Sequence, residues 1–316
     1  MNLVPYLTAE EIRERTPYPE LIATLDDVFR GDATAPPRHH HQVPQGHGPD
    51  ATLLIMPAWR PQGSVGVKVV NVYPENGARG LPAVQGIYLL FHGQTGELVA
   101  LADGPEITAR RTAAASALAS RYLASEQARV MLMVGTGRLS RELIRAHRCV
   151  RNLDEVLVWG RDPDKAQAVV QDLDDGSFSI RAVPTLESAA RQADLISTAT
   201  LARQPLIEGA WLKPGSHLDL VGSYRADMRE TDDEVMRRAT AVYVDTRAGA
   251  LSEGGDLVQT IASGALDESK IVAELADLAR GYPVQRPDGQ ITVFKSVGAS
   301  IEDLAAAELC LKNDLA

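Results

Sequence analysis

The chain has 316 residues, more than one hydrophobic core usually supports, so its length favours two domains. Its hydrophobic content of 45% and charged content of 23% are typical of a globular protein and argue against a disordered chain. The net charge of −10 argues against sequence-independent binding of nucleic acid, which requires a basic surface.

The N-terminal segment MNLVPYLTAEEIRERTPYPE carries acidic residues and prolines where an export signal has a basic start and an apolar run. The longest apolar runs are shorter than the roughly 20 residues that a membrane helix requires. The two cysteines, Cys149 and Cys310, lie in helix-like stretches and do not indicate a disulfide framework. We therefore expect a cytoplasmic protein that does not span a membrane.

The first third of the chain contains helical and extended patterns. Apolar residues at helical spacing predict two short helices within Thr8–Phe29, separated by prolines. Three extended segments follow, ATLLIMPAW, SVGVKVVNVYP and VQGIYLLFHGQTGELVALA, and the last contains a hairpin at His92–Gly96. They predict an antiparallel sheet with flanking helices. The alanine-rich stretch Pro105–Ala124 predicts one long helix that leads into the second domain.

The second part of the chain alternates apolar strands with amphipathic helices, beginning with ARVMLMV, RLSRELIRAHRCV and EVLVWG. This alternation predicts a parallel sheet covered on both faces. SHLDLVG and AVYVDT extend the sheet, and ITVFKSVGAS leads into a final helix with capping-box spacing between Ser300 and Asp303. The predicted fold class is α/β, with a Rossmann doubly wound parallel sheet at 121–297 and an α+β substrate domain at 1–120.

A glycine turn after the first parallel strand is a candidate dinucleotide site. Gly135 and Gly137 follow an apolar strand and precede a helix, as in the turns that hold a pyrophosphate at a helix N-terminus. Ser140, at the third position, is small enough for close helix packing. A GxGxxS pattern alone also fits an ordinary glycine turn. The remaining candidate residues of this turn are Thr136, Arg138 and Leu139.

The next strand ends before Arg161, which lies 26 residues beyond Gly135, near the ribose-reading position. A guanidinium there, with Asp162 beside it, favours the 2′-phosphate of NADP (NADPH), and NAD stays possible. Arg161 also fits a solvated helix start, and Asp162 fits an N-cap. Thr198 and Val221 belong to strand ends at the carboxyl edge of the sheet, where the nicotinamide is expected.

The first domain offers several candidate side chains for a substrate or a metal ion. Lys68 lies in a mostly apolar row, which fits either a binding site or an edge-strand lysine. Arg110 and Arg111 point about 100° apart on a helix, so at most one is expected to face a given pocket. His39–His41 and His47 lack the spacing of zinc ligands and are interpreted as a polar loop, so we predict no metal.

Seven motifs together resemble the ornithine cyclodeaminase/mu-crystallin family over essentially the whole chain. They are PPR at Pro36–Arg38, IMPAW from Ile55, GVKVVNVYPEN around Lys68, ARRTAAASALAS around Arg111, GTG at Gly135, VWGRDPDKA from Val158, and VFKSVGASIEDLAAA near the C-terminus. The resemblance implies an NAD(P)-dependent enzyme that acts on a small α-imino or α-amino acid. It also implies a homodimer built through the N-terminal domain and a C-terminal helix, 298–316, that packs back onto that domain.

The same resemblance assigns roles to individual residues. Arg38 and Arg111 correspond to the pair that grips the substrate carboxylate, for which forked guanidinium groups are suited. Lys68 corresponds to the residue beside the reacting carbon. Thr112 and Ser296 correspond to residues near the nicotinamide.

Two departures from the family pattern bear on the reaction. Ornithine cyclodeaminases carry acidic residues where this chain has Leu54 and Tyr224, although Asp227 lies close in the same loop and is a possible substitute. A site without those acids favours NADPH-dependent reduction of a cyclic α-imino acid to the L-amino acid, with Lys68 orienting the substrate or supplying a proton. The substrate expected is Δ1-pyrroline-2-carboxylate or Δ1-piperideine-2-carboxylate.

Three alternatives stay open at this point. The first is conversion of L-ornithine to L-proline and ammonia with bound NAD. The second is an alanine dehydrogenase activity. The third is a non-catalytic protein that binds NADPH and a small ligand.

Overall fold

The computed structural model describes residues 4–284 and 289–312 and divides the chain into two compact units. Unit 1 runs to Thr112 and resumes at Ala299, and unit 2 comprises Ala113–Gly298. The boundary falls inside helix α3 (Gly104–Leu123), so the expected boundary at 120/121 lies further along the same helix. Residues 313–316 of the expected C-terminal helix lie outside the described residues.

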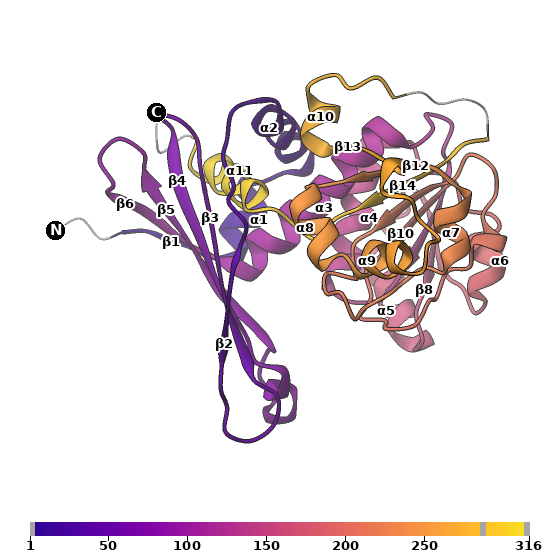
Figure 1. The fold of residues 1–316 in the computed structure, drawn as a ribbon, viewed down its shortest axis with the longest axis horizontal. Helices are drawn as coiled ribbons and strands as arrows, with labels where there is room; N and C mark the ends of the chain where they lie inside the picture. Colours follow the sequence, from indigo (N-terminus) through magenta and orange to yellow (C-terminus); the bar gives the residue numbers. More distant parts are fainter. Residues whose placement is uncertain (1–3, 285–288, 313–316) are drawn as a thin grey trace. The chain divides into compact units, whose positions relative to one another are not determined.

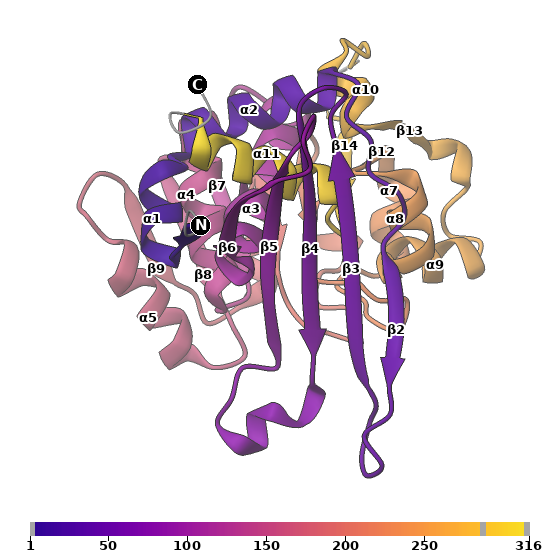
Figure 2. The same ribbon diagram turned by 90° about the vertical axis from the view of Figure 1, so that its left-hand side faces the viewer.

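Unit 1 contains a six-stranded sheet in the order β1-β6-β5-β4-β3-β2 (Figure 2). β1 pairs with β6 in parallel, and the other neighbours are antiparallel. Its strands are β1 (Tyr6–Leu7), β2 (His39–Val43), β3 (Ala51–Trp59), β4 (Ser64–Val72), β5 (Val84–His92) and β6 (Leu98–Asp103). The helices wholly within this unit are α1 (Ala9–Arg15), α2 (Tyr18–Arg30), the 3-10 helix η1 (Pro74–Arg79) and α11 (Ser300–Leu311).

Period-two alternation gives this sheet one well-buried face. Met56, Lys68 and Tyr88 stand in one cross-strand row and are each at most 3% exposed. α11 contacts β3, β4 and β5, and it also packs against α2. A helix distant in the sequence therefore covers the antiparallel strands of unit 1.

The predicted pair of short helices and the β5–β6 hairpin are both confirmed. Thr8 and Glu11 form a capping box at α1, which explains why that helix begins where it does. The interpretation of His39–His41 as a loop is wrong, because these residues form most of strand β2. β2 pairs only with β3 and lies at the edge of the sheet, where polar side chains face solvent.

Unit 2 contains an eight-stranded parallel sheet in the order β13-β12-β14-β11-β10-β7-β8-β9. Figure 1 labels β8, β10, β12, β13 and β14 of this sheet. From β9 through β14 this is the Rossmann order, with the direction of winding reversed between β7 and β10. The strands are β7 (Val130–Val134), β8 (Glu155–Trp159), β9 (Ser179–Ala182), β10 (Leu195–Thr198), β11 (His217–Leu220), β12 (Ala239–Val244), β13 (Ile271–Glu274) and β14 (Ile291–Lys295). The predicted α/β class is confirmed.

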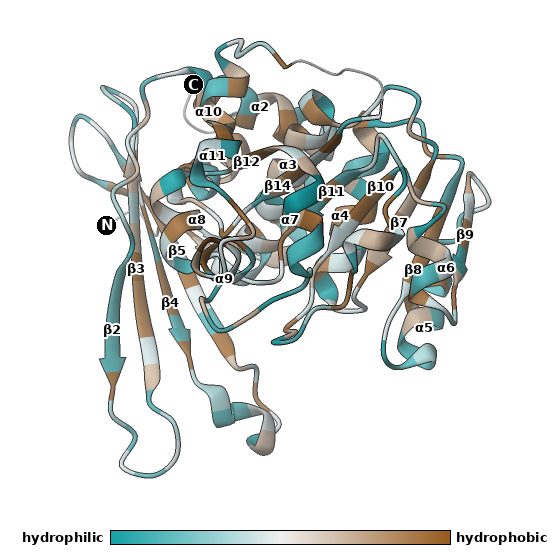
Figure 3. Ribbon diagram, turned by 45° about the vertical axis from the view of Figure 1, so that its right-hand side comes forward, coloured by the Kyte–Doolittle hydropathy of each residue, from teal (hydrophilic) through white to brown (hydrophobic). Residues whose placement is uncertain are grey.

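Helices connect these strands, and Figure 3 shows mostly hydrophobic strands beside helices of mixed hydropathy. One hydrophobic core takes buried residues from β7, β8, β10, β11, β12 and β14. α4 contacts β7, and α5 contacts β8 and β9. The helices are α4 (Arg138–Val150), α5 (Pro163–Leu173), α6 (Leu186–Ala190), α7 (Asp233–Arg238), α8 (Arg247–Glu253), α9 (Gly255–Ala262) and α10 (Leu275–Ala279), with 3-10 helices η2 (Gly209–Trp211) and η3 (Glu268–Lys270).

The start of α11 differs from the expected capping box between Ser300 and Asp303. The carboxylate of Glu302 accepts the Ala299 N–H at 3.2 Å, while the Ser300 hydroxyl donates to the Pro57 carbonyl at 2.7 Å. Asp303 instead accepts from Lys68, at 2.8 Å. The reason is burial: α11 is enclosed on nearly all sides, so Asp303 pairs with buried cations, while Glu302 caps the Ala299 N–H and also pairs with Arg111.

Candidate active site

A buried ionic cluster lies beneath the sheet of unit 1. Lys68, on β4, is 2% exposed, and its ammonium donates to Asp303 Oδ1 at 2.8 Å and to Thr108 Oγ1 at 3.3 Å. Arg111, on α3, is 4% exposed and donates through Nε to Asp303 at 2.9 Å and through Nη1 to Glu302 at 2.7 Å. One carboxylate of α11 thus joins a lysine of the sheet to an arginine of α3.

The electrostatics of this cluster bring in a third cation. Burial lowers the pKa of Lys68 to about 8; Asp303 opposes this shift, whereas Arg111 and Arg38 add to it. Burial also acts against the charge on Arg111, but Asp303 and Glu302 outweigh it and raise the pKa of that guanidinium. Three cations therefore share a region with two carboxylates, and this set carries a net charge of +1 when Lys68 is protonated.

The structure thus brings together the three side chains that the sequence analysis assigned to the substrate, Arg38, Lys68 and Arg111. Their roles in binding and catalysis stay predictions. The edge-strand alternative for Lys68 does not hold, because β4 lies between β3 and β5. Arg110 is also buried, but it donates to Thr16, in keeping with the expectation that adjacent arginines face different surroundings.

Sequence reasoning missed Glu302, Asp303 and Tyr88. A signal for the first two was present, because an acidic pair in the otherwise apolar helix SIEDLAAAELCL must find buried partners. Tyr88 stands directly opposite Lys68 across β4 and β5. Its buried hydroxyl has no hydrogen-bond partner within the described part of the chain. Burial, followed by Asp303 and Glu308, raises the pKa of Tyr88, so its phenol is neutral.

Glycine is required beside this tyrosine. A Cβ atom on Gly66 would lie 1.9 Å from the Tyr88 hydroxyl oxygen, closer than any non-bonded contact. The small residue on β4 therefore leaves the space that the phenol fills.

The glycine turn of unit 2 has the geometry that a pyrophosphate requires. Gly135 has φ of +123°, and a Cβ there would lie 2.6 Å from the Ala199 carbonyl oxygen, so no other residue fits without strain. Gly137 is the N-cap of α4, and no side chain caps that helix. A Cβ on Gly137 would meet nothing within 4 Å, so its surroundings are open. These residues fit a phosphate-bearing group at the helix N-terminus.

The other predicted cofactor residues that follow β7 and β8 differ in burial and in their contacts. Thr136 packs its methyl group against Gly160, and Arg138 is exposed while Leu139 is partly buried at the start of α4. Arg161 is exposed just beyond β8. Asp162 caps α5 by accepting the N–H groups of Asp164 and Lys165, which is the alternative that the sequence left open.

Three predicted nicotinamide contacts lie at the carboxyl edge of the parallel sheet. Thr198 ends β10, Val221 follows β11, and Ser296 follows β14. Thr112 lies on α3, next to Arg111, and is half-buried. No contact in the structure tests these roles, so they stay predictions.

The structure also describes the two positions at which this chain departs from the cyclodeaminase pattern, and the nearby Asp227. Leu54 is partly buried on β3, and Tyr224 is 40% exposed. Asp227 accepts from Arg225 at 2.8 Å and lies 3.5 Å from Arg203. Asp227, the candidate substitute for those acids, is therefore paired with arginines.

Residues 4–284 and 289–312 contain no cluster of three or more His, Cys, Asp or Glu side chains arranged to hold a metal ion. Within the same ranges, no helix has the length and apolar character needed to cross a membrane.

Comparison with known proteins gives a consistent result. The family model for the ornithine cyclodeaminase/mu-crystallin family matches residues 6–315. A Delta(1)-pyrroline-2-carboxylate reductase of Paracoccus denitrificans is 40% identical over 285 residues, which cover 87% of this chain and 90% of the relative.

Two solved structures share the fold of both units. The Delta(1)-pyrroline-2-carboxylate reductase of Thermococcus litoralis, in complex with NADH and L-proline, aligns with a TM-score of 0.92 and 33% identity. That alignment covers 99% of this chain and 98% of the other. An archaeal alanine dehydrogenase dimer with bound NAD aligns with a TM-score of 0.90 and 28% identity, covering 99% and 96% of the two chains.

Proposed function

This chain belongs to the ornithine cyclodeaminase/mu-crystallin family, and we propose that it is an NAD(P)H-dependent ketimine reductase. Its proposed substrate is Δ1-pyrroline-2-carboxylate or the six-membered Δ1-piperideine-2-carboxylate, and its product is the L-amino acid. The observation that carries this proposal is the cluster formed by the buried Lys68 and Arg111 with the partly buried Arg38, which suits one small carboxylate. The reductases of Paracoccus and Thermococcus named above support the substrate class.

The two arginines hold the substrate carboxylate. Arg111 is fixed in orientation by Asp303 and Glu302, so little conformational freedom is lost when a carboxylate binds. Arg38 supplies the second guanidinium. The surplus positive charge of the cluster stabilises an anion in surroundings that exclude water, where the interaction is stronger than in bulk solvent.

The reaction converts a C=N bond into CH–NH and consumes one hydride and one proton. Reduced dinucleotide supplies the hydride when it is bound. Lys68 supplies the proton to the imine nitrogen, directly or through a water molecule. Burial brings its pKa to about 8, well below the ordinary value for lysine, so the ammonium gives up a proton more readily near neutral pH.

The dinucleotide is held by the turn from Gly135 to Leu139, with its pyrophosphate at the start of α4. Arg161 binds the 2′-phosphate of NADPH, and NADH is the less favoured donor. The open surroundings of Gly137 and the absence of a side-chain cap on α4 support this assignment. The nicotinamide end is assigned to Thr112, Thr198, Val221 and Ser296.

The proposed oligomer is a homodimer formed through unit 1. The face of the sheet opposite α11 carries apolar side chains that are only partly buried, including Val65, Val67, Val69, Leu89 and Phe91. A row of this kind is typical of a face that a second subunit covers. The dimeric alanine dehydrogenase that shares the fold supports the proposal.

Ornithine cyclodeamination is the second candidate, because it is the namesake activity of the family. It is disfavoured by Leu54 and Tyr224 at the positions of the family's acids and by the pairing of Asp227 with Arg225. The carboxylate of Asp227 in that loop is paired with Arg225 and Arg203.

The proposal is tested by assaying the purified protein with four substrate sets in parallel. These are NADPH with each cyclic imino acid, NADPH with pyruvate and ammonia, and NAD with L-ornithine. We expect cofactor oxidation with an imino acid and little change in the other sets. Ammonia release from ornithine without imine reduction would contradict the proposal, as would tight NADPH binding with no turnover of any substrate.

A further inference from the structure

A second buried ionic cluster lies in unit 2, where strands of the parallel sheet end. Glu230 is fully buried, and its carboxylate accepts four hydrogen bonds, each of 2.8 Å. The donors are the Thr198 hydroxyl, the Thr200 N–H, the Thr200 hydroxyl and the Gly222 N–H. Glu230 therefore joins the end of β10 to the turn that follows β11.

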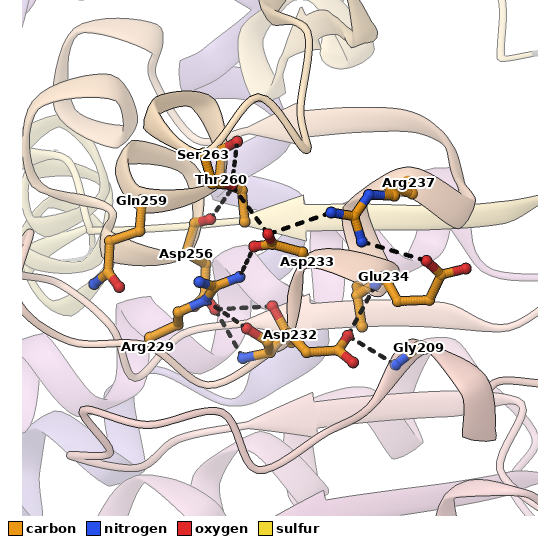
Figure 4. A network of polar contacts seen from close by, with 12 residues as sticks. Gly209, Arg229, Asp232, Asp233, Glu234, Arg237, Asp256, Gln259, Thr260 and Ser263 are labelled. Carbon is orange, nitrogen blue, oxygen red and sulfur yellow. Dashed lines mark hydrogen bonds and ion pairs between the residues drawn. The ribbon is translucent and has the colours of Figure 1, made fainter.

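Glu230 is itself held in place by Asp256, the second residue of α9. Asp256 accepts the backbone N–H groups of Glu230 and Thr231 at 3.0 and 2.9 Å, and the Ser223 hydroxyl at 2.5 Å. Figure 4 shows Asp256 beside the neighbouring polar contacts of Arg229, Asp232 and Asp233. The segment that carries Glu230 is thus fixed on both sides.

Lys295 is the buried counter-ion of this cluster. It ends β14, is fully buried, and donates to the Leu220 carbonyl at 3.0 Å. Burial lowers the pKa of Lys295, and Asp256, Glu230, Asp245 and Asp219 oppose that shift. For Glu230, burial and then Asp256 raise the pKa, while Lys295 acts in the opposite direction.

A buried carboxylate, that of Asp245, also holds the loop after β14. Asp245 accepts the backbone N–H groups of Val297 and Gly298 at 2.8 and 2.6 Å. The loops after β10, β11 and β14 are therefore each tied by a buried carboxylate near Lys295. Such desolvated groups have few alternative partners, so they specify one conformation of these loops.

We propose that Glu230 is a positioning residue that sets the nicotinamide-binding edge of the sheet, with Lys295 compensating its buried charge. This inference rests on the proposed dinucleotide-dependent function, because Thr198, Val221 and Ser296 belong to the segments so fixed. The pyrophosphate turn has a separate anchor: the Gly135 N–H donates to the Trp159 carbonyl at 2.9 Å, which does not involve Glu230 or the residues that donate to it. Loss of Glu230 therefore affects the nicotinamide half of the cofactor more than the pyrophosphate half.

Glu230→Gln tests this asymmetry, because a glutamine amide has one acceptor oxygen where the carboxylate has two and leaves a buried N–H without a partner. Calorimetric titration measures binding of NADPH and of 2′-phospho-ADP-ribose, which lacks the nicotinamide ring. We expect NADPH to bind about tenfold more weakly and 2′-phospho-ADP-ribose to lose less than about threefold. Glu234→Gln, on the same stretch but at the surface, should change neither affinity.

Unchanged NADPH binding by Glu230→Gln, or equal loss for both ligands, would overturn the inference, the second by indicating a general defect of the fold. If Glu230→Gln does not fold, two substitutions at Thr200 provide a second test. Thr200→Val removes one hydroxyl donor to Glu230, while Thr200→Ser retains it. We expect weaker NADPH binding for valine than for serine, and equal affinities would contradict the proposal. Because these are binding measurements, they stand apart from whether the protein reduces imines.

Discussion

Lys68 and Asp303 form an ion pair of 2.7 Å inside unit 1, with both side chains at most 2% exposed. Removing water from two charges costs free energy that their attraction repays only when the geometry is good and other bonds are satisfied. Asp303 meets this condition by accepting from Arg111 as well. The pair therefore preserves an ammonium at a position where burial alone would favour the neutral amine.

Asp303→Asn tests this relation through the pH dependence of kcat/KM. In the wild type, the protonated form of Lys68 predominates below about pH 8, so activity should fall as the pH rises through that value. Asp303 raises the pKa of Lys68, so its loss should move this alkaline limb to lower pH by at least about one unit. Glu308→Gln, on the same helix but paired with Arg60, should leave the limb in place. If the alkaline limb is unchanged in Asp303→Asn, Lys68 is not the proton donor.

The proposed preference for NADPH rests on a single residue, Arg161. Arg161→Asp replaces a guanidinium with a carboxylate at the predicted 2′-phosphate position, so the ratio of kcat/KM for NADPH to that for NADH should fall about tenfold or more. Arg181→Asp, an exposed charge change on β9, serves as the control. If Arg161→Asp retains the full preference for NADPH, Arg161 does not bind the 2′-phosphate.

Gly135 and Gly137 both lie in the turn between β7 and α4, but glycine is needed at each position for a different reason. Gly135 needs its positive φ and its contact with Ala199, whereas Gly137 has ordinary backbone geometry and open space around it. The first is required for the fold, and we propose that the second is required for access of the cofactor.

Alanine at each position separates these requirements. Gly135→Ala should lower both the free energy of unfolding, by about 1–3 kcal/mol, and the affinity for NADPH, because it adds strain and a clash. Gly137→Ala should unfold at nearly the wild-type temperature yet bind NADPH more weakly, since its methyl group enters the space of the pyrophosphate. Thermal unfolding and calorimetric titration measure the two effects. Wild-type affinity in Gly137→Ala would argue against a phosphate at this helix N-terminus.

At the scale of the whole molecule, the half-buried apolar face of the six-stranded sheet is the proposed interface of the dimer. Sedimentation equilibrium should give twice the chain mass of 34.0 kDa. Val67→Glu places a charge within that face and should shift the mass towards that of a single chain. Gln94→Glu, in the exposed β5–β6 turn, should not. A wild-type protein that sediments as a single chain at all concentrations would refute the dimer.

The fold was largely predictable because its signals are local. The period-two strands, the alanine-rich helix and the apolar strand before Gly135 are all read from neighbouring residues. The polar sequence of β2 carries no alternation, so it was mistaken for a loop. The elements β13 and α10 were not predicted, because a four-residue strand runs straight into a five-residue helix with no turn residue between them.

The site was less predictable, because its partners are distant in the sequence. Lys68 and Asp303 are separated by 235 positions, so no local sequence pattern predicts their ion pair. The local sequence offered Lys68 and Arg111 as candidates, but only the family resemblance joined them with Arg38 in one substrate site. Glu230 and Asp256 escaped notice for the same reason: each looks like a surface acid until the fold buries it.

The central claim is net reduction of a cyclic imine by the dinucleotide, and isotope transfer tests it most directly. Δ1-pyrroline-2-carboxylate is incubated with NADPH that carries deuterium at the transferred position, and the product is examined by mass spectrometry. The account predicts L-proline with one deuterium at its α-carbon and an equal amount of oxidised cofactor. Absence of deuterated proline, with the labelled NADPH still bound and unchanged, would contradict it.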